Sequence, residues 1–308
     1  MSPRLPTNLK KPALDFCRVT ISKMKDTKET VEIFSLPLWS SGLNSFTAKL
    51  RHHLLSVSKL KLLATPNPEQ VVLASYQPEF FKALSRFDWL VPDGVGLVKA
   101  SCWLKSRGKL KRCLKERVTG VDVVSWLFGF AVENGLKVLL VGGRNLESLE
   151  LKIKNVKLKI IEGKKLASLA NRQKVEVEEV GDNHSKNVIF WVEGYRDKLK
   201  PTKMEEQMID HVITELKPDI VLVALGAPEQ EFWLIQHHEF LDKAGVKLGM
   251  VVGGAVDMLS GRLKRAPLVW QRLGLEWLWR LAQEPWRWRR QLRLVRFVWL
   301  VIRYPRAK

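Results

Sequence analysis

An aspartate set between a proline and a glycine, Asp93, is the residue of this sequence best suited to act as a general base. It follows a short apolar segment, residues 89–91, which predicts a buried strand. A carboxylate at the end of a strand can be held rigidly and still meet a substrate, and a general base needs that placement. An Asx-type turn, in which the carboxylate bonds only to its own backbone, explains the same residues equally well.

Three further predicted strands end in turns of glycine and polar residues, at 142–144, 226–230 and 253–257. In an open parallel sheet such turns gather at the carboxyl ends of the strands, where ligands bind. Together with the turn at 92–96 they favour a nucleotide-type cleft over plain tight turns. No turn matches the G-x-G-x-x-G spacing closely and no Walker A sequence is present, which argues against classical dinucleotide and P-loop sites.

Several polar residues in or near these turns each allow two interpretations. Thr65 and Asn67 lie in a turn with two prolines, where they can hold sugar hydroxyls or cap the next helix. Gln230 can touch a ligand or lie solvated in the first turn of a helix. Asp257 can bond ligand hydroxyls or stabilise a helix start.

The Gly253-Gly254 turn follows a predicted strand and opens a helix, so its backbone N–H groups favour an anion. Arg117 and Arg265 could neutralise a diphosphate, although a single arginine in so basic a chain is more often a surface charge. The sequence has no D-x-D motif, no histidine pair at i,i+4 and no metal-like cysteine spacing. We therefore expect neither a metal site nor a cofactor.

The 308-residue chain has 46% hydrophobic residues and a formal net charge of +20. This composition predicts a folded protein with a polyanionic partner, which could be nucleic acid, an anionic membrane face or a phosphate-rich substrate. No apolar signal-peptide core is visible at the N-terminus, and no stretch reaches the roughly 18 apolar residues of a spanning helix. The odd cysteine count suggests no disulfide framework, so we expect a cytoplasmic protein whose contact with a membrane is peripheral.

The elements that must position these residues alternate between strands, glycine turns and helices. This alternation predicts an α/β, Rossmann-like fold with a mostly parallel sheet and helices on both faces. Expected strands lie at 31–38, 89–91, 137–141, 188–192, 219–225 and 248–252; expected helices lie at 45–55 (with Ser45 as cap), 69–75, 79–85, 121–134 and 203–216. We divide the chain into an extension (1–30), an α/β domain (31–261) with a variable insert (161–187), and a C-terminal helical basic segment (262–308).

The C-terminal tail, residues 286–303, predicts a basic amphipathic helix. Arginines occupy one sector of that helix, while Trp288, Leu292, Val295, Trp299 and Ile302 occupy another. Such a helix suits an anionic membrane surface better than duplex DNA, which would leave the apolar sector exposed. The alternative is a helix that packs its apolar stripe on the body or on another subunit of a homo-oligomer. The residues expected to bind the membrane are Trp286, Trp288, Arg289, Arg293, Arg296, Trp299 and Arg303.

Eight motifs, covering about residues 31–290, resemble those of the WecG/TagA/CpsF bacterial glycosyltransferases (family 26). In chain order they are Thr65-x-Asn67, Pro92-Asp93-Gly94-Val95-Gly96, Glu116-Arg117-Val118-Thr119-Gly120, Gly226-Ala227-Pro228-x-Gln230-Glu231, Gly253-Gly254-x-x-Asp257, Lys264-Arg265-Ala266-Pro267, Arg272-Leu273-Gly274-Leu275-Glu276-Trp277 and Gln283-Glu284-Pro285. The chain departs from the family pattern in the charged segment 161–187, in Pro66 and in Ala255, and these departures bear mainly on donor identity.

The resemblance implies an inverting, metal-independent enzyme of cell-surface polysaccharide or teichoic acid synthesis. It would move N-acetylmannosamine or its uronic acid from a UDP donor to N-acetylglucosamine on a polyprenyl diphosphate, at the inner face of the plasma membrane. The resemblance implies that Asp93 is the base and that Thr65 and Asn67 lie beside it. It places Gln230, Gly253, Gly254 and Asp257 near the donor, and Arg117 and Arg265 near the departing diphosphate.

Two rival hypotheses belong to other classes of protein. One is a non-catalytic basic α/β module that binds nucleic acid, and the other is an inactive scaffold that docks to membrane-bound partners. The intact Asp93 turn argues against the scaffold, and we expect no nucleic-acid partner.

Overall fold

The computed structural model describes residues 29–56, 59–143, 150–153, 156–159, 161–162, 189–259, 263–285 and 288–305. Its main sheet has the strand order β1-β2-β4-β3-β11-β10-β5-β9-β8, and every neighbouring pair except β1 and β2 is parallel. The strands are β1 (Thr30–Ile33), β2 (Leu36–Trp39), β3 (Lys61–Ala64), β4 (Trp89–Leu90), β5 (Val138–Gly142), β8 (Ile161–Glu162), β9 (Ile189–Val192), β10 (Ile220–Ala224) and β11 (Leu248–Val251). The predicted mostly parallel α/β fold is confirmed.

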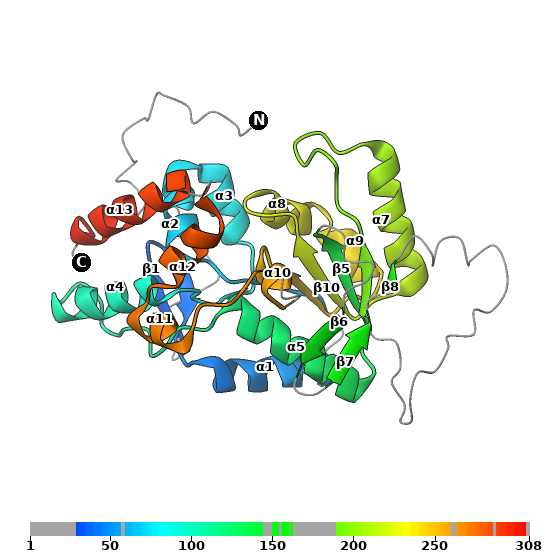
Figure 1. Ribbon diagram of the computed structural model, residues 1–308, viewed down its shortest axis with the longest axis horizontal. Coiled ribbons are helices and arrows are strands. Elements are labelled where there is room, and N and C mark those ends of the chain that lie inside the picture. Colours follow the sequence, from blue (N-terminus) through cyan, green and yellow to red (C-terminus); the bar gives the residue numbers. More distant parts are fainter. Residues whose placement is uncertain are drawn as a thin grey trace.

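Helices cover both faces of this sheet (Figure 1). Successive strand residues point to opposite faces, so that Leu62 belongs to one core and Leu63 to the other. One core is covered by α2 (Pro68–Tyr76), α3 (Pro78–Leu84), α4 (Val95–Ser106), α7 (Lys203–Leu216), α8 (Glu229–Gln236), α9 (His238–Lys243) and α13 (Trp288–Ile302). The other is covered by α1 (Leu43–Ser56), α5 (Gly120–Asn134) and α10 (Ala255–Leu259).

Polar residues in the turns start several of these helices. The side chain of Asn67 accepts from the backbone N–H of Gln70 at the start of α2, and Thr119 accepts from the N–H of Asp122 at the start of α5. Gly135 ends α5 in the left-handed conformation, at φ 64°. These caps fix where each helix begins and ends, and hence where the turns face.

Strand order brings the turns of distant segments to one edge of the sheet. β3 lies between β4 and β11, so the turn after β3 has the Asp93 turn on one side and the Gly253 turn on the other. The N–H of Asp93 donates to the carbonyl of Pro66 at 3.0 Å, which joins the first two of these turns directly. This edge is where a parallel sheet binds ligands.

The C-terminal segment contains α11 (Leu268–Leu273), α12 (Glu276–Gln283) and α13. In Figure 1 these helices, drawn in orange to red, lie beside α2 and α4. Phe297, Leu300 and Val301 of α13 are buried in the core shared with α2. The described residues of this segment thus form three helices, and one side of the last helix belongs to the protein core.

Two local predictions were wrong. Residues 31–38 form two antiparallel strands rather than one, because Phe34 (φ 52°) and Ser35 (φ 59°) make a tight turn between them. Ser45 does not cap α1, which begins at Leu43; the N–H of Leu43 donates to the carboxylate of Glu116 at 2.7 Å.

No element was predicted in the segment that follows β5. It contains an antiparallel hairpin of β6 (Glu150–Ile153) and β7 (Val156–Lys159), and β8 extends the main sheet. Apart from β8, the predicted insert 161–187 lies outside the described residues, as do residues 1–28 of the predicted extension.

Candidate active site

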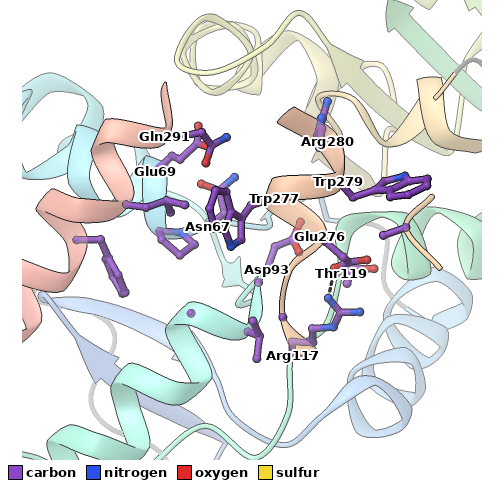
Figure 2. A pocket seen from close by; sticks show the side chains of 18 of the residues that line it. Asn67, Glu69, Asp93, Arg117, Thr119, Glu276, Trp277, Trp279, Arg280 and Gln291 are labelled. Carbon is purple, nitrogen blue, oxygen red and sulfur yellow. Dashed lines mark hydrogen bonds and ion pairs between the residues drawn. The ribbon is translucent and has the colours of Figure 1, made fainter. Parts of the chain in front are cut away.

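A cavity of about 740 Å³ lies at the carboxyl edge of the sheet, between the α/β body and the C-terminal helices. Its polar end is formed by residues from the start of α2 and the turn before it, the turn before α4, the loops before α5 and α11, and α12 (Figure 2). These polar residues are Asn67, Glu69, Asp93, Arg117, Thr119, Arg265, Glu276 and Arg280. Four predicted site residues, Asn67, Asp93, Arg117 and Arg265, therefore line one cavity.

Asp93 is partly exposed on the cavity wall, and its carboxylate accepts a long hydrogen bond. The N–H of Gly120 lies 3.5 Å from Asp93 Oδ2. Burial raises the pKa of Asp93 to about 6; the Gly120 N–H and Arg117 oppose this rise, whereas Glu276 adds to it. A carboxylate with such a pKa accepts a proton more readily than an ordinary aspartate and is still ionised at neutral pH.

Thr65 and Asn67 occupy different positions around this aspartate. A Cβ atom built on Gly120 would lie 3.0 Å from Thr65 Oγ1 and 3.8 Å from Asp93 Oδ2, so Thr65 and Asp93 both flank Gly120. Thr65 does not line the cavity, whereas Asn67 does. Asn67 also forms a capping box with Gln70, which confirms the capping interpretation of its side chain.

Both predicted diphosphate-binding arginines already have carboxylate partners. Arg117 forms a close ion pair with Glu276 and donates to Gln271 Oε1 at 3.2 Å. Arg265 lies 2.9 Å from Asp122 Oδ1. These carboxylates fix the orientation of both guanidinium groups on the cavity wall.

Gln230, Gly253, Gly254 and Asp257 do not line the cavity around Asp93. Gln230 is buried, with 4% of its surface exposed, so the interpretation as a solvated first-turn residue was wrong. Its Oε1 accepts from the N–H groups of Gly226 and Gly253, both at 3.2 Å, and thereby joins the turns after β10 and β11. The roles of these four residues in binding the donor stay predictions.

A buried carboxylate, Glu231, extends this connection to the Asn67 turn. Glu231 Oε1 accepts from Gln230 Nε2 at 3.1 Å and from Gln70 Nε2 at 2.9 Å. Glu231 is fully buried, and burial raises its pKa to about 7. The network links the turns after β10 and β11 to the capping box that holds Asn67.

Sequence reasoning missed Arg280 as a site residue. It lies on α12 and lines the cavity, and a Cβ atom built on Gly254 would lie 2.4 Å from Arg280 Nη2. Its Nε donates to Glu284 at 2.9 Å. Only its place between two motifs, Glu276-Trp277 and Gln283-Glu284-Pro285, could have indicated it, because the contact with Gly254 depends on the folding of α12 over the body.

The outer face of α13 agrees with the predicted amphipathic pattern. The apolar stripe is exposed: Trp288 at 54%, Leu292 at 53%, Val295 at 70%, Trp299 at 36% and Ile302 at 58%. Arg296 lies over the ring of Tyr76 on α2, and Arg303 lies over Trp299. Trp286 and the side chain of Arg289 lie outside the described residues.

The comparisons with known proteins agree with this geometry. The model of the WecG/TagA/CpsF glycosyl transferase family matches residues 31–308. The chain belongs to the WecG/TagA/CpsF family. The resemblance that the motifs predicted is thus confirmed over both the α/β body and the C-terminal helices.

Two curated relatives carry the same name, N-acetylglucosaminyldiphosphoundecaprenol N-acetyl-beta-D-mannosaminyltransferase. The protein of Bacillus subtilis (strain 168) is 29% identical over 280 residues, which cover 91% of this chain and 94% of the relative. The protein of Bacillus spizizenii (strain ATCC 23059 / NRRL B-14472 / W23) is 31% identical over 279 residues, covering 91% and 93%. This member of the WecG/TagA/CpsF family is therefore a glycosyltransferase that matches its relatives along nearly their whole length.

Among the described residues of this family member, no three His, Cys, Asp or Glu side chains gather in a way that could hold a metal ion. None of the helices in the described ranges is long and apolar enough to cross a membrane.

Proposed function

We propose that this protein transfers an N-acetylmannosamine-like sugar from a UDP-sugar to N-acetylglucosamine on a polyprenyl diphosphate. The observation that carries the proposal is Asp93, a carboxylate of raised pKa on the wall of a cavity in a chain of this glycosyltransferase family. The names of the two relatives support the sugar and the acceptor. The product would serve cell-surface polysaccharide or teichoic acid synthesis.

In the proposed reaction Asp93 takes the proton of the acceptor hydroxyl. The acceptor oxygen attacks the anomeric carbon of the donor from the face opposite the nucleotide, and the carbon–oxygen bond to UDP breaks. The electron pair leaves with the diphosphate, so the configuration at the anomeric carbon inverts. A base on one face and a charge-stabilised leaving group on the other are what this displacement needs.

Positive charge on the cavity wall supports departure of the nucleotide. Arg117, Arg265 and Arg280 all line the cavity, and Arg280 adjoins the Gly254 turn. Guanidinium groups held by carboxylates can meet a diphosphate without first being ordered, which favours stabilisation of developing charge. We propose that these residues take the place of a divalent cation and that no metal ion takes part.

We further propose that the enzyme works peripherally on the cytoplasmic face of the plasma membrane. The exposed apolar stripe of α13 and the arginines beside it support binding to anionic lipids. We propose no nucleic-acid partner, because a duplex would leave that stripe in water.

The test is UDP release from UDP-N-acetylmannosamine in the presence of a short-chain polyprenyl diphosphate N-acetylglucosamine, with a chelator present. We expect release that depends on the acceptor and survives the chelator. An Asp93→Asn variant should lose about 10²–10⁴-fold in rate. The control Asp88→Asn, directly before β4, should stay active. An unchanged rate in Asp93→Asn would remove the base assignment, and a panel of other UDP-sugars would identify a different donor.

A further inference from the structure

Two helices form one long wall of the cavity. From α4 it includes residues three or four positions apart, which share one face of the helix, and from α13 a second such series. The α4 residues are Val95, Gly96, Lys99, Ala100 and Trp103, and the α13 residues are Gln291, Leu294, Phe297, Val298, Val301 and Ile302. The cavity therefore extends from the Asp93 turn along both helices.

The chemical character of this wall changes with distance from Asp93. Asp93 lies two residues before the start of α4, and Asn67 and Glu69 lie near it on the cavity wall (Figure 2). One helical turn into α4 lies Lys99, about 6 Å along the helix axis from Val95. One further turn on, at about 12 Å, lies Trp103. Towards the C-terminal end of α13 its lining residues are aliphatic: Val298, Val301 and Ile302.

The apolar end is held together by a lysine that follows α4. Lys109 Nζ donates to the carbonyls of Tyr304 at 2.5 Å and Ile302 at 3.3 Å, at the end of α13. The side chains of Lys109 and Arg107 lie over the ring of Trp103, at 5.8 Å and 5.3 Å from its centroid. The two helices are thus tied together where the wall is most apolar.

This order of groups matches one class of ligand: an amphiphile with a polar head, an anionic centre and an apolar tail. We propose that the groove between α4 and α13 binds the polyprenyl diphosphate of the acceptor. Lys99 would contact the diphosphate, and Trp103, Val298 and Ile302 would contact the first isoprene units. The identification of polyprenyl diphosphate as the natural ligand rests on the proposed function. A nucleotide fits the distal end poorly, because the aliphatic side chains there offer its base no hydrogen bonds.

Direct binding of farnesyl diphosphate, which carries no sugar, tests the groove independently of turnover. Val298 and Ile302 are 56% and 58% exposed, so Val298→Asp and Ile302→Asp should fold. We expect each variant to raise the Kd for farnesyl diphosphate by about ten-fold or more, because the bound isoprenoid chain would bury the charge of the new aspartate. The matched control is Val295→Asp, at a position 70% exposed on the same helix that does not line the cavity. If Val295→Asp weakens binding equally, or if the Kd is unchanged in all three variants, the isoprenoid chain does not bind in this groove.

The diphosphate contact has its own matched pair on α4. Lys99 is exposed and lines the cavity, whereas Lys105 is exposed on the same helix and does not. We expect Lys99→Gln to weaken the binding of farnesyl diphosphate by about ten-fold and to leave the binding of farnesol unchanged. Lys105→Gln should change neither. Equal effects of the two lysine variants would overturn the Lys99 assignment.

Turnover separates failure of this inference from failure of the proposed function. Val298→Asp should raise KM for a full-length polyprenyl acceptor in detergent micelles but leave KM for a methyl diphosphate acceptor within about two-fold. A KM that rises equally for both acceptors would contradict binding of the polyprenyl chain in the groove, although it would not contradict the proposed reaction. If the unmodified protein binds farnesyl diphosphate in the groove but releases no UDP with either acceptor, the proposed function fails and the site stands.

Discussion

Arg117 of the α/β body forms an ion pair with Glu276 of α12, and the two residues are separated by 159 positions in the chain. Both side chains line the cavity that holds Asp93, and both affect its pKa (Figure 2). The C-terminal segment therefore contributes directly to the electrostatics of the candidate base.

Replacing Glu276 by glutamine should move the pH dependence of transfer. The negative charge of Glu276 raises the pKa of Asp93 and Arg117 lowers it, so Glu276→Gln should lower the pKa of Asp93 below about 6. At pH 5 the fraction of maximal kcat/KM should rise about two-fold or more. The control is Glu239→Gln, which removes an exposed ion pair with Lys243. An acidic limb that stays in place or moves to higher pH would contradict the coupling.

The unmodified enzyme should lose activity as the pH falls through about 6, because Asp93 must be ionised to accept a proton. The acidic limb of kcat/KM reports the ionisation of the free enzyme. A limb near pH 4, where an ordinary aspartate titrates, would show that burial does not raise the pKa of the working base.

Asp93→Asn should stabilise the folded protein while it removes activity. The folded state raises the pKa of Asp93 from 3.8 to about 6, so this residue's contribution to stability is full below pH 4 and is lost as the pH rises through about 6. At pH 8 the variant should therefore gain up to about 3 kcal/mol in the free energy of unfolding. Urea unfolding at pH 4 and pH 8 measures this gain, which should nearly vanish at the lower pH.

Glu231 should produce a second pH-dependent loss of stability, at higher pH. Burial raises its pKa from 4.5 to about 7, so its stabilising contribution falls between those two values and is gone above them. A Glu231→Gln variant should lack this fall, which amounts to at most about 3 kcal/mol. Unfolding of both proteins from pH 4 to pH 8 tests the assignment. Parallel stability curves would show that Glu231 titrates normally.

The exposed stripe of α13 should carry membrane binding. Replacing Trp288, Leu292, Val295 and Trp299 by glutamine should weaken binding to anionic vesicles at least about 100-fold, because each apolar side chain contributes about 1.5–3 kcal/mol when buried. Flotation with vesicles of anionic phospholipid measures this. Deleting the helix is a poorer test, since Phe297, Leu300 and Val301 are buried in the body.

The control for that experiment replaces two exposed apolar residues elsewhere, Leu199 (69% exposed) and Met204 (77% exposed), by glutamine. It should bind vesicles like the unmodified protein. Full retention of binding by the stripe variant would rule out α13 as the membrane contact.

The sequence predicted those elements that are marked by a pattern within their own residues. The α7 helix was predicted at the residues observed, and Thr119 and Gly135 delimit α5 as caps do. The turn at Phe34 and Ser35 was missed because neither residue is typical of a left-handed turn. The ring of Phe34 packs against Phe297 and Tyr304 near the far end of the chain, and no local pattern contains that contact.

The same distinction applies to the candidate site. Asp93 could be predicted, because its strand and turn are contiguous in sequence. The ion pairs of Arg117 and Arg265 could not, since their partners lie on other elements. Arg280 was missed for the same reason, because its proximity to Gly254 exists only after α12 packs over the body.

Ile302 belongs both to the exposed stripe of α13 and to the lining of the cavity. If the stripe rests in lipid, the hydrocarbon of the bilayer and the interior of the enzyme become continuous at this one side chain. A lipid-borne substrate could then slide from one apolar medium into the other without its chain crossing water. The face of α13 that binds the membrane would then also be the site where the acceptor enters the cavity.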